Sequence, residues 1–109
     1  MTDHNLDEIL HLLSDQYRRQ TIQILRQSRD GEVGFGELLD GLIRSTGENG
    51  TRRDHIAIQL HHNHLPKLTG ENLITYDQDA GHVRYRPSKK VEEVMDGISL
   101  QQIHPASDD

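Results

Sequence analysis

The sequence predicts a mainly α-helical domain with one small β-hairpin, and two observations lead to that fold class. Apolar residues recur at helical spacing in five separate stretches, and two short runs within residues 73–86 alternate apolar and polar residues as a half-buried hairpin does. A chain of 109 residues has room for one domain with a modest core. We therefore expect one domain over residues 5–100 and a frayed tail over residues 101–109.

The first two predicted helices cover residues 5–13 and 15–28. Helical spacing in the first is set by Leu6, Ile9, Leu10 and Leu13, and in the second by Tyr17, Thr21, Ile24, Leu25 and Ser28. Ser14 and Asp15 are residue types that cap the start of a helix. The Arg-Asp-Gly sequence at 29–31 should end the second helix.

A short strand and a third helix should follow. Residues 32–34 are flanked by glycines and allow a single-bridge strand. Residues 37–43 place their apolar side chains on one side of a helix. Residues 45–51 have the composition of a loop, which would separate this helix from the next by more than the usual tight turn.

The fourth predicted helix, residues 52–64, has one apolar side and one polar side. Helical spacing along the polar side connects Arg52, His55, Gln59 and His62. Pro66 lacks a backbone N–H and disfavours helical geometry at the residue before it. Two alternatives stay open at this point: the helix continues beyond a kink, or a separate turn begins.

The hairpin and a last helix complete the chain. Strands are expected at 73–77 and 82–86, after a left-handed exit at Asn72 and joined by residues 78–81. Ser88 is suited to cap the last helix. The apolar stripe of that helix consists of Val91, Val94, Met95 and Ile98.

This order of elements is that of a winged helix-turn-helix domain, and two motifs add a resemblance to known families. LHHNHLPKLTGENLITYD resembles the recognition-helix-to-wing stretch of ArsR-like regulators, and SDQYRRQTIQIL resembles their second helix. Both motifs are still more similar to an uncharacterised family of winged-helix domains from salt-loving archaea, over residues 6–86. The resemblance implies DNA binding. The long 45–51 loop departs from the usual turn, and without cysteine no thiolate metal sensing carries over.

Composition disfavours an enzyme. Hydrophobic residues make up only 32% of the chain, so a large apolar substrate cavity would consume core that the domain needs. No phosphate-binding glycine loop, nucleophile elbow or spaced carboxylate pair is present. We expect a non-enzymatic protein without cofactor or bound metal. No long apolar run or basic leader is found, so we expect a cytoplasmic protein and no membrane contact.

The net charge of −6 is unusual for a DNA-binding protein, but the positive charge is concentrated. Residues 82–90 contain two arginines and two lysines and no acid, and residues 51–69 contain three cations and one acid. The field near such basic segments matters more for docking than the total charge. The acidic, lysine-poor remainder suits a salt-rich cytoplasm, although an ordinary acidic protein is the simpler alternative.

The expected function is that of a DNA-binding transcriptional regulator. Arginine and glutamine pair with guanine and adenine edges, and the other polar residues can hold phosphate. The alternative for the helix is a merely solvated polar face, and for the hairpin cations a role in solubility. The expected DNA-facing residues are Arg52, Arg53, His55, Gln59, His62, Asn63, Lys67, Arg84, Arg86, Lys89 and Lys90.

The expected partners are double-stranded DNA and a second copy of the chain. The apolar stripes of the first and last helices exceed what a small core needs, which favours a homodimer through these helices. The alternative function is a winged-helix module that binds another protein through its acidic body, without direct DNA contact.

Structural roles are expected for other charged and metal-ligating residues. Arg18, Arg19 and Arg26 can pair with Asp15, Glu8 or other acids across helices, or touch the phosphate backbone, and we favour the structural alternative. His61 and His64 stand at i, i+3 and suggest a metal site completed by His55, His4 or His11. We favour instead a structural His64 that packs and hydrogen-bonds between helix and wing.

Overall fold

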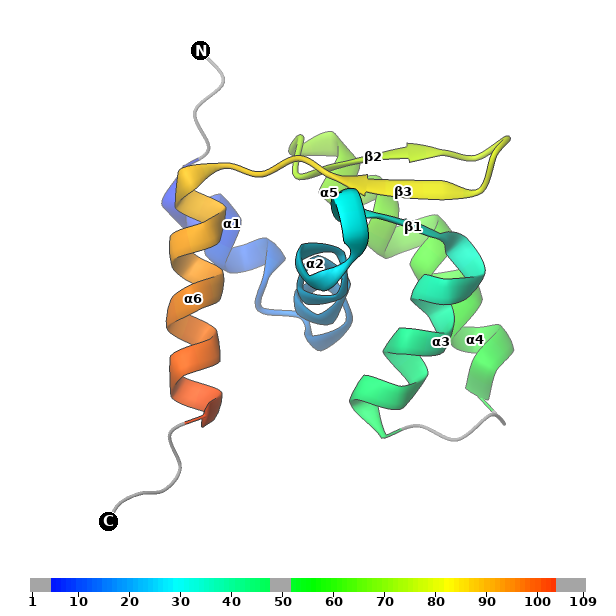
Figure 1. Cartoon of the computed structure of the whole chain (residues 1–109), viewed down its shortest axis with the longest axis horizontal. Helices are drawn as coiled ribbons and strands as arrows, with labels where there is room; N and C mark the ends of the chain where they lie inside the picture. Colours follow the sequence, from blue (N-terminus) through cyan, green and yellow to red (C-terminus); the bar gives the residue numbers. More distant parts are fainter. Residues whose placement is uncertain (1–4, 48–51, 104–109) are drawn as a thin grey trace.

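The computed structural model describes residues 5–47 and 52–103 and has the predicted winged helix-turn-helix fold (Figure 1). It is mainly helical, with a small antiparallel sheet. The elements are α1 (Leu6–Leu12), α2 (Gln16–Gln27), the 3-10 turn η1 (Arg29–Gly31), β1 (Glu32–Gly34), α3 (Phe35–Thr46), α4 (Arg53–Gln59), the π-helical segment η3 (Leu60–His64), α5 (Leu65–Gly70), β2 (Ile74–Asp77), β3 (His82–Tyr85) and α6 (Lys89–Ile103).

The first two helices are confirmed, and side-chain caps explain where they begin. The side chain of Asn5 accepts a hydrogen bond from the Asp7 N–H at the start of α1. Asp15 does the same for α2, where its Oδ1 accepts from the N–H groups of Tyr17 and Arg18 at 2.8 and 3.2 Å. These caps satisfy N–H groups that have no partner within the helix.

The sheet has three strands in the order β1-β3-β2, one more than the predicted hairpin. Residues 32–34 pair with β3 along their whole length, with Val33 opposite Val83, so they form more than a single bridge. The hairpin itself is confirmed. Gly81, at φ +69°, and Asn72, at φ +64°, take the left-handed conformations that the turn and the exit from α5 require.

The third helix is longer than the predicted 37–43. It begins at Phe35, because Glu37 turns back to accept a hydrogen bond from the Gly34 N–H, and it continues through Thr46 to a left-handed Gly47. The prediction of loop at residues 45 and 46 is therefore wrong. Residues 48–51, the rest of that predicted loop, lie outside the described residues.

The fourth predicted helix continues past Pro66, which decides between the two alternatives left open. The segments α4, η3 and α5 follow one another with helical backbone angles at Leu60, His64 and Leu65. The Leu65 N–H donates to the Leu60 carbonyl five residues back, which makes a π turn just before the proline. The wider turn accommodates a proline ring that would collide with the carbonyl four residues back in a regular helix.

A buried core joins every helix to the sheet. Its fully buried large side chains include Ile9, Ile22, Leu25, Leu38, Leu42, Leu60, Leu65, Leu68, Leu73, Ile74, Val83 and Val91. Helix α2 runs through the middle of the molecule, with α1 and α6 on one side, α3 and α4 on the other, and the sheet across one end (Figure 1). None of the helices in the described part is long and apolar enough to span a bilayer.

The last helix is capped as predicted but ends later. Ser88 Oγ accepts a hydrogen bond from the Val91 N–H at 3.2 Å. The helix runs through Ile103, so residues 101–103 of the expected tail are helical, while residues 104–109 lie outside the described residues.

Candidate functional site

The candidate recognition segment consists of α4, η3 and α5, and one side of it lies in the core. That buried side is formed by Ile56, Leu60, His64, Leu65 and Leu68. The opposite side carries Ile58, His62 and Pro66, which follow one another at intervals of four residues and are all exposed. The segment thus presents one continuous ridge to solvent, in the position of the second helix of a helix-turn-helix unit.

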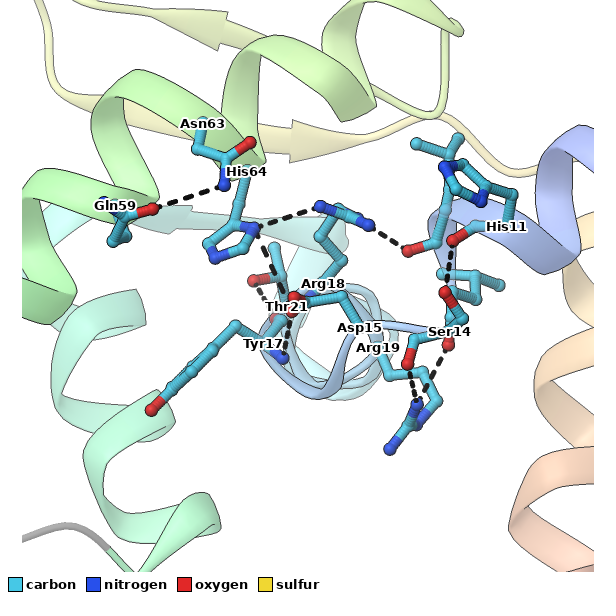
Figure 2. Close-up of polar contacts among 12 residues, drawn as sticks. His11, Ser14, Asp15, Tyr17, Arg18, Arg19, Thr21, Gln59, Asn63 and His64 are labelled. Carbon is cyan, nitrogen blue, oxygen red and sulfur yellow. Dashed lines mark hydrogen bonds and ion pairs between the residues drawn. The ribbon is translucent and has the colours of Figure 1, made fainter.

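The predicted DNA-facing residues of this segment do not all lie on that ridge. Arg52, Arg53, His55 and Lys67 are exposed at its ends and flank, as His62 is on the ridge itself. Gln59 and Asn63 are half-buried on the flank toward α2, where the Asn63 Nδ2–H donates to Gln59 Oε1 at 3.3 Å (Figure 2). Sequence reasoning missed Ile58, because it assigned apolar residues to the core.

A cleft of about 220 Å³ lies between this flank and α2. Its walls include Asp15 and Tyr17 from α2, Arg52 and His55 near the start of α4, and the Gln59–Asn63 pair. Most of its lining residues carry polar or charged side chains.

The floor of the cleft is a buried polar cluster around His64 (Figure 2). Arg18 Nη1 lies 3.3 Å from His64 Nδ1, and Arg18 Nε donates to the Leu12 carbonyl at 2.7 Å. The Tyr17 ring stacks on the imidazole with centroids 5.7 Å apart. Burial lowers the pKa of His64, and the positive charges of Arg18 and Lys67 act in the same direction, against the opposing effect of Asp15.

The structural role predicted for His64 is confirmed, but its predicted position between helix and wing is wrong. Its partners all lie on α2 or its cap. His64 lies on the same side of the helix as Leu60, and this side faces the core next to α2 rather than the hairpin. The expected acid pairing across helices is confirmed only for Arg26, which binds acids of α6. Arg18 and Arg19 have structural contacts too, but with backbone carbonyls near the end of α1 in place of the expected acids.

The contact between helix and wing is made by His61. Its Nδ1 lies 3.0 Å from the Tyr76 hydroxyl, and the Phe35 ring lies near both residues. Burial raises the pKa of Tyr76, so this hydroxyl stays protonated. The three side chains come from η3, β2 and α3, so this contact joins the recognition segment to the hairpin and to α3.

Two of the arginines that were expected to face DNA are paired with carboxylates. Arg53 Nη1 lies 2.7 Å from Asp40 Oδ1 on α3. On the outer face of the sheet, Glu32 lies between Arg84 Nη2 at 2.7 Å and His82 Nδ1 at 2.6 Å. The hydrogen bond from His82, together with the charge of Arg84, holds the pKa of Glu32 below its usual range. Sequence reasoning did not find these pairs because their members are distant in the chain.

The remaining expected cations are exposed but do not all lie beside the recognition segment. Arg86 follows β3, where its N–H donates to the Leu73 carbonyl. Lys89 and Lys90 begin α6, which stands on the other side of α2 from α4 (Figure 1). The structure thus brings Arg52, Arg53, His55, Gln59, His62, Asn63 and Lys67 together on one segment, and it places Lys89 and Lys90 away from them.

One protein-family model matches most of the chain. The model of a domain of unknown function, DUF7344, matches residues 10–84. The chain belongs to the DUF7344 family. The matched range holds all of α2 through β2, including the recognition segment, the His64 cluster and the His61–Tyr76 contact. No curated protein and no solved structure matches the chain.

The DUF7344 match ends before the contacts that hold α6. Arg26 of α2 lies 3.0 Å from Glu92 and 2.5 Å from Asp96, and the Tyr85 hydroxyl donates a short hydrogen bond to Glu92. Burial and the Glu92 carboxylate raise the pKa of Tyr85 far above its usual value, so the Tyr85 hydroxyl keeps the proton that it donates to Glu92. This cluster joins α6 to the DUF7344 domain.

The histidines of the DUF7344 domain are distributed among different contacts. His64 points to α2 and His61 to the hairpin, because the π turn separates the two directions. Within residues 5–47 and 52–103, no three His, Cys, Asp or Glu side chains are grouped closely enough to hold a metal ion.

Proposed function

We propose that this protein binds double-stranded DNA as a transcriptional regulator. In the proposed complex the ridge of α4, η3 and α5 enters the major groove and the β2–β3 hairpin contacts the adjacent backbone or minor groove. The observation that carries this proposal is the recognition segment itself. It is anchored in the core by Ile56, Leu60 and Leu65, and it leaves a complete outer side exposed.

The distribution of charge supports the proposal. Arg52 and Arg53 stand at the start of the segment and Lys67 near its end, so cations flank the ridge on both ends. Phosphates of a duplex flank the major groove in the same way. The local basic field attracts DNA although the chain as a whole carries −6.

The resemblance to ArsR-like regulators supports the same function, which we place in the cytoplasm. The proposed role is non-enzymatic and uses no cofactor. The proposed contact is made by the exposed ridge of the recognition segment rather than by a cavity.

A salt titration tests the proposal. The full chain is mixed with short duplexes of random sequence, and affinity is measured over a range of KCl concentrations by fluorescence anisotropy. We expect log affinity to fall linearly with log salt by about 0.9 for each phosphate contacted. Absence of binding at every salt concentration would contradict DNA binding.

The alternative of a protein-binding module has one specific observation in its favour. Ile58 is exposed on the ridge, and both Arg53 and Arg84 are already paired with acids. A ridge with an apolar centre suits a protein partner as well as a groove of DNA. The salt titration separates the two functions, because a protein adaptor should show no salt-dependent affinity for DNA.

We also propose a homodimer through α1 and α6, on a smaller surface than the sequence suggested. Ile9, Leu13, Val91 and Met95 of the two apolar stripes are buried in the core of the single chain. Leu6 and Leu10 remain about half exposed on α1, which packs against α6. Sedimentation at high salt tests this proposal: Leu6→Gln with Leu10→Gln should give a monomer, and a parent that is already monomeric at high micromolar concentration would contradict it.

A further inference from the structure

Ile58 is the one apolar side chain that stands out on the recognition segment. Its side chain is 54% exposed, whereas Ile56 and Leu60 on the same helix are buried. The other exposed large hydrophobic residues in the described part of the chain, Leu6 and Leu10, lie together on α1. Ile58 therefore needs an explanation of its own, separate from the dimer surface.

Ile58 lies on the exposed ridge of the recognition segment. It follows Asp54 and precedes His62 by four residues each, and these three positions form one row along the helix. The row lies opposite the residues that enter the core. If the segment lies in a major groove, Ile58 faces the floor of that groove, while Arg53 and Lys67 stand near its edges.

The chemistry of an isoleucine at this position selects one feature of DNA. The floor of the major groove carries a single apolar group, the C5-methyl of thymine, and apolar side chains contact it. A β-branched side chain on a helix has one strongly preferred rotamer, so Ile58 loses little conformational entropy on contact. Beside cytosine or guanine the same side chain would cover polar groups without satisfying them.

We propose that Ile58 is a specificity-determining residue that contacts the thymine methyl group, so that the preferred site contains thymine opposite the end of α4. This inference rests on the proposed DNA binding. His62, the next residue of the row, can donate to or accept from the neighbouring base pair. The ridge then distinguishes bases through one apolar and one polar contact, without an arginine at its centre.

The test uses duplexes that differ only in the methyl group. The best binding duplex is selected from a random-sequence pool with the full-length parent, and each thymidine in it is replaced in turn by deoxyuridine. We expect one position in each half-site at which the parent loses about fourfold in affinity, the value for one methyl group removed from contact. The Ile58→Ala variant should bind the duplex with thymidine at that position and the duplex with deoxyuridine there with equal affinity.

Controls separate failure of the inference from failure of DNA binding. Gln27→Ala truncates an exposed, uncharged side chain at the end of α2, outside both the ridge and the dimer surface, and should keep the parent's dependence on thymine. Salt-dependent binding that is unchanged by deoxyuridine at every position, or that keeps its thymine dependence in Ile58→Ala, would overturn the role of Ile58 and leave DNA binding intact. No binding of the parent to any duplex would overturn both. Because Ile58 is exposed, Ile58→Ala should keep the parent's far-UV circular dichroism.

Discussion

Arg18 Nη1 lies 3.3 Å from Nδ1 of His64, and both side chains are buried. A guanidinium only donates hydrogen bonds, so His64 Nδ1 accepts and the ring proton is on Nε2. The recognition segment is therefore attached to α2 through a neutral histidine. A second proton on His64 would remove this acceptor and place two positive charges together.

The first prediction concerns the dependence of stability on pH. Burial lowers the pKa of folded His64 below its unfolded value of 6.5, so the unfolded chain binds more protons between the two values. The free energy of unfolding should be highest above pH 6.5 and fall as pH decreases toward the folded pKa. The slope from this one residue is at most about 1.4 kcal/mol per pH unit.

His64→Asn is the variant that checks this slope, because its side-chain oxygen replaces Nδ1 as an acceptor but does not titrate. Urea unfolding is measured across pH 5 to 8 for the parent, for His64→Asn and for His11→Asn, which changes an exposed histidine of α1. The stability of His64→Asn should depend less on pH below 6.5 than that of either other protein. Identical pH dependence in all three would contradict a neutral, buried His64.

The second prediction concerns Arg18 itself. Arg18→Leu keeps bulk but leaves the Leu12 carbonyl without its donor and His64 Nδ1 without its partner. A buried polar group without a hydrogen bond costs about 1–3 kcal/mol, and two are created, so we expect a loss of about 2–6 kcal/mol by urea unfolding. Arg29→Leu, at an exposed position of η1, should change stability by less than about 0.5 kcal/mol. Equal effects of the two substitutions would contradict the buried role of Arg18.

The buried role of Arg18 shows where reasoning from the sequence stops. Helical spacing and capping residues predicted α1, α2, the hairpin and the start of α6, because these depend on near neighbours in the chain. The contact between Arg18 and His64 joins residues that are 46 positions apart, so no local pattern indicates it. The same holds for the pair of Arg84 with Glu32, which exists because β1 joins the hairpin.

The candidate site was predicted in part for a similar reason. A regular helix over residues 52–64 correctly placed Arg52, His55 and His62 outside the core. It could not show that the flank with Gln59 and Asn63 faces α2, or that the π turn at 60–64 sends His61 and His64 to different neighbours. A π turn has no sequence signal apart from the proline that follows it.

The third prediction concerns the attachment of α6. Glu92 accepts from both Arg26 and Tyr85, so Glu92→Ala leaves a partly buried guanidinium and a hydroxyl with fewer partners. We expect a loss of about 1–2 kcal/mol in the free energy of unfolding. Glu93→Ala removes the same charge from an exposed position one residue further and should have almost no effect. If the dimer forms through α6, Glu92→Ala should also weaken the dimer and Glu93→Ala should not. Sedimentation measures this difference.

The fourth prediction separates base contacts from phosphate contacts. Gln59→Ala should cost about 1–3 kcal/mol on the preferred duplex and little on random DNA, if the Gln59 amide leaves Asn63 to bind an adenine edge. Replacing Arg84 and Arg86 together with alanine should weaken binding to all duplexes alike and flatten the salt dependence. Anisotropy titrations on both kinds of duplex give the comparison. If neither variant changes affinity where the parent binds, the DNA-facing surface lies elsewhere.

The fifth prediction uses the carboxylate that holds Arg84. Glu32 accepts from Arg84 at 2.7 Å, and its lowered pKa keeps it charged at neutral pH, so it competes with DNA phosphate for the same guanidinium. Glu32→Gln removes that charge and should strengthen DNA binding, while it steepens the salt dependence by about 0.9 if Arg84 gains one phosphate contact. Glu93→Gln makes the same change in net charge on α6 and should leave affinity nearly unchanged. The gain should disappear when Arg84→Ala is added to Glu32→Gln, because the effect acts through the freed guanidinium. A gain in DNA affinity that persists without Arg84 would mean that only the total charge matters. If Glu32→Gln and Glu93→Gln gave the same gain in affinity, the hairpin would not be part of the DNA-binding surface.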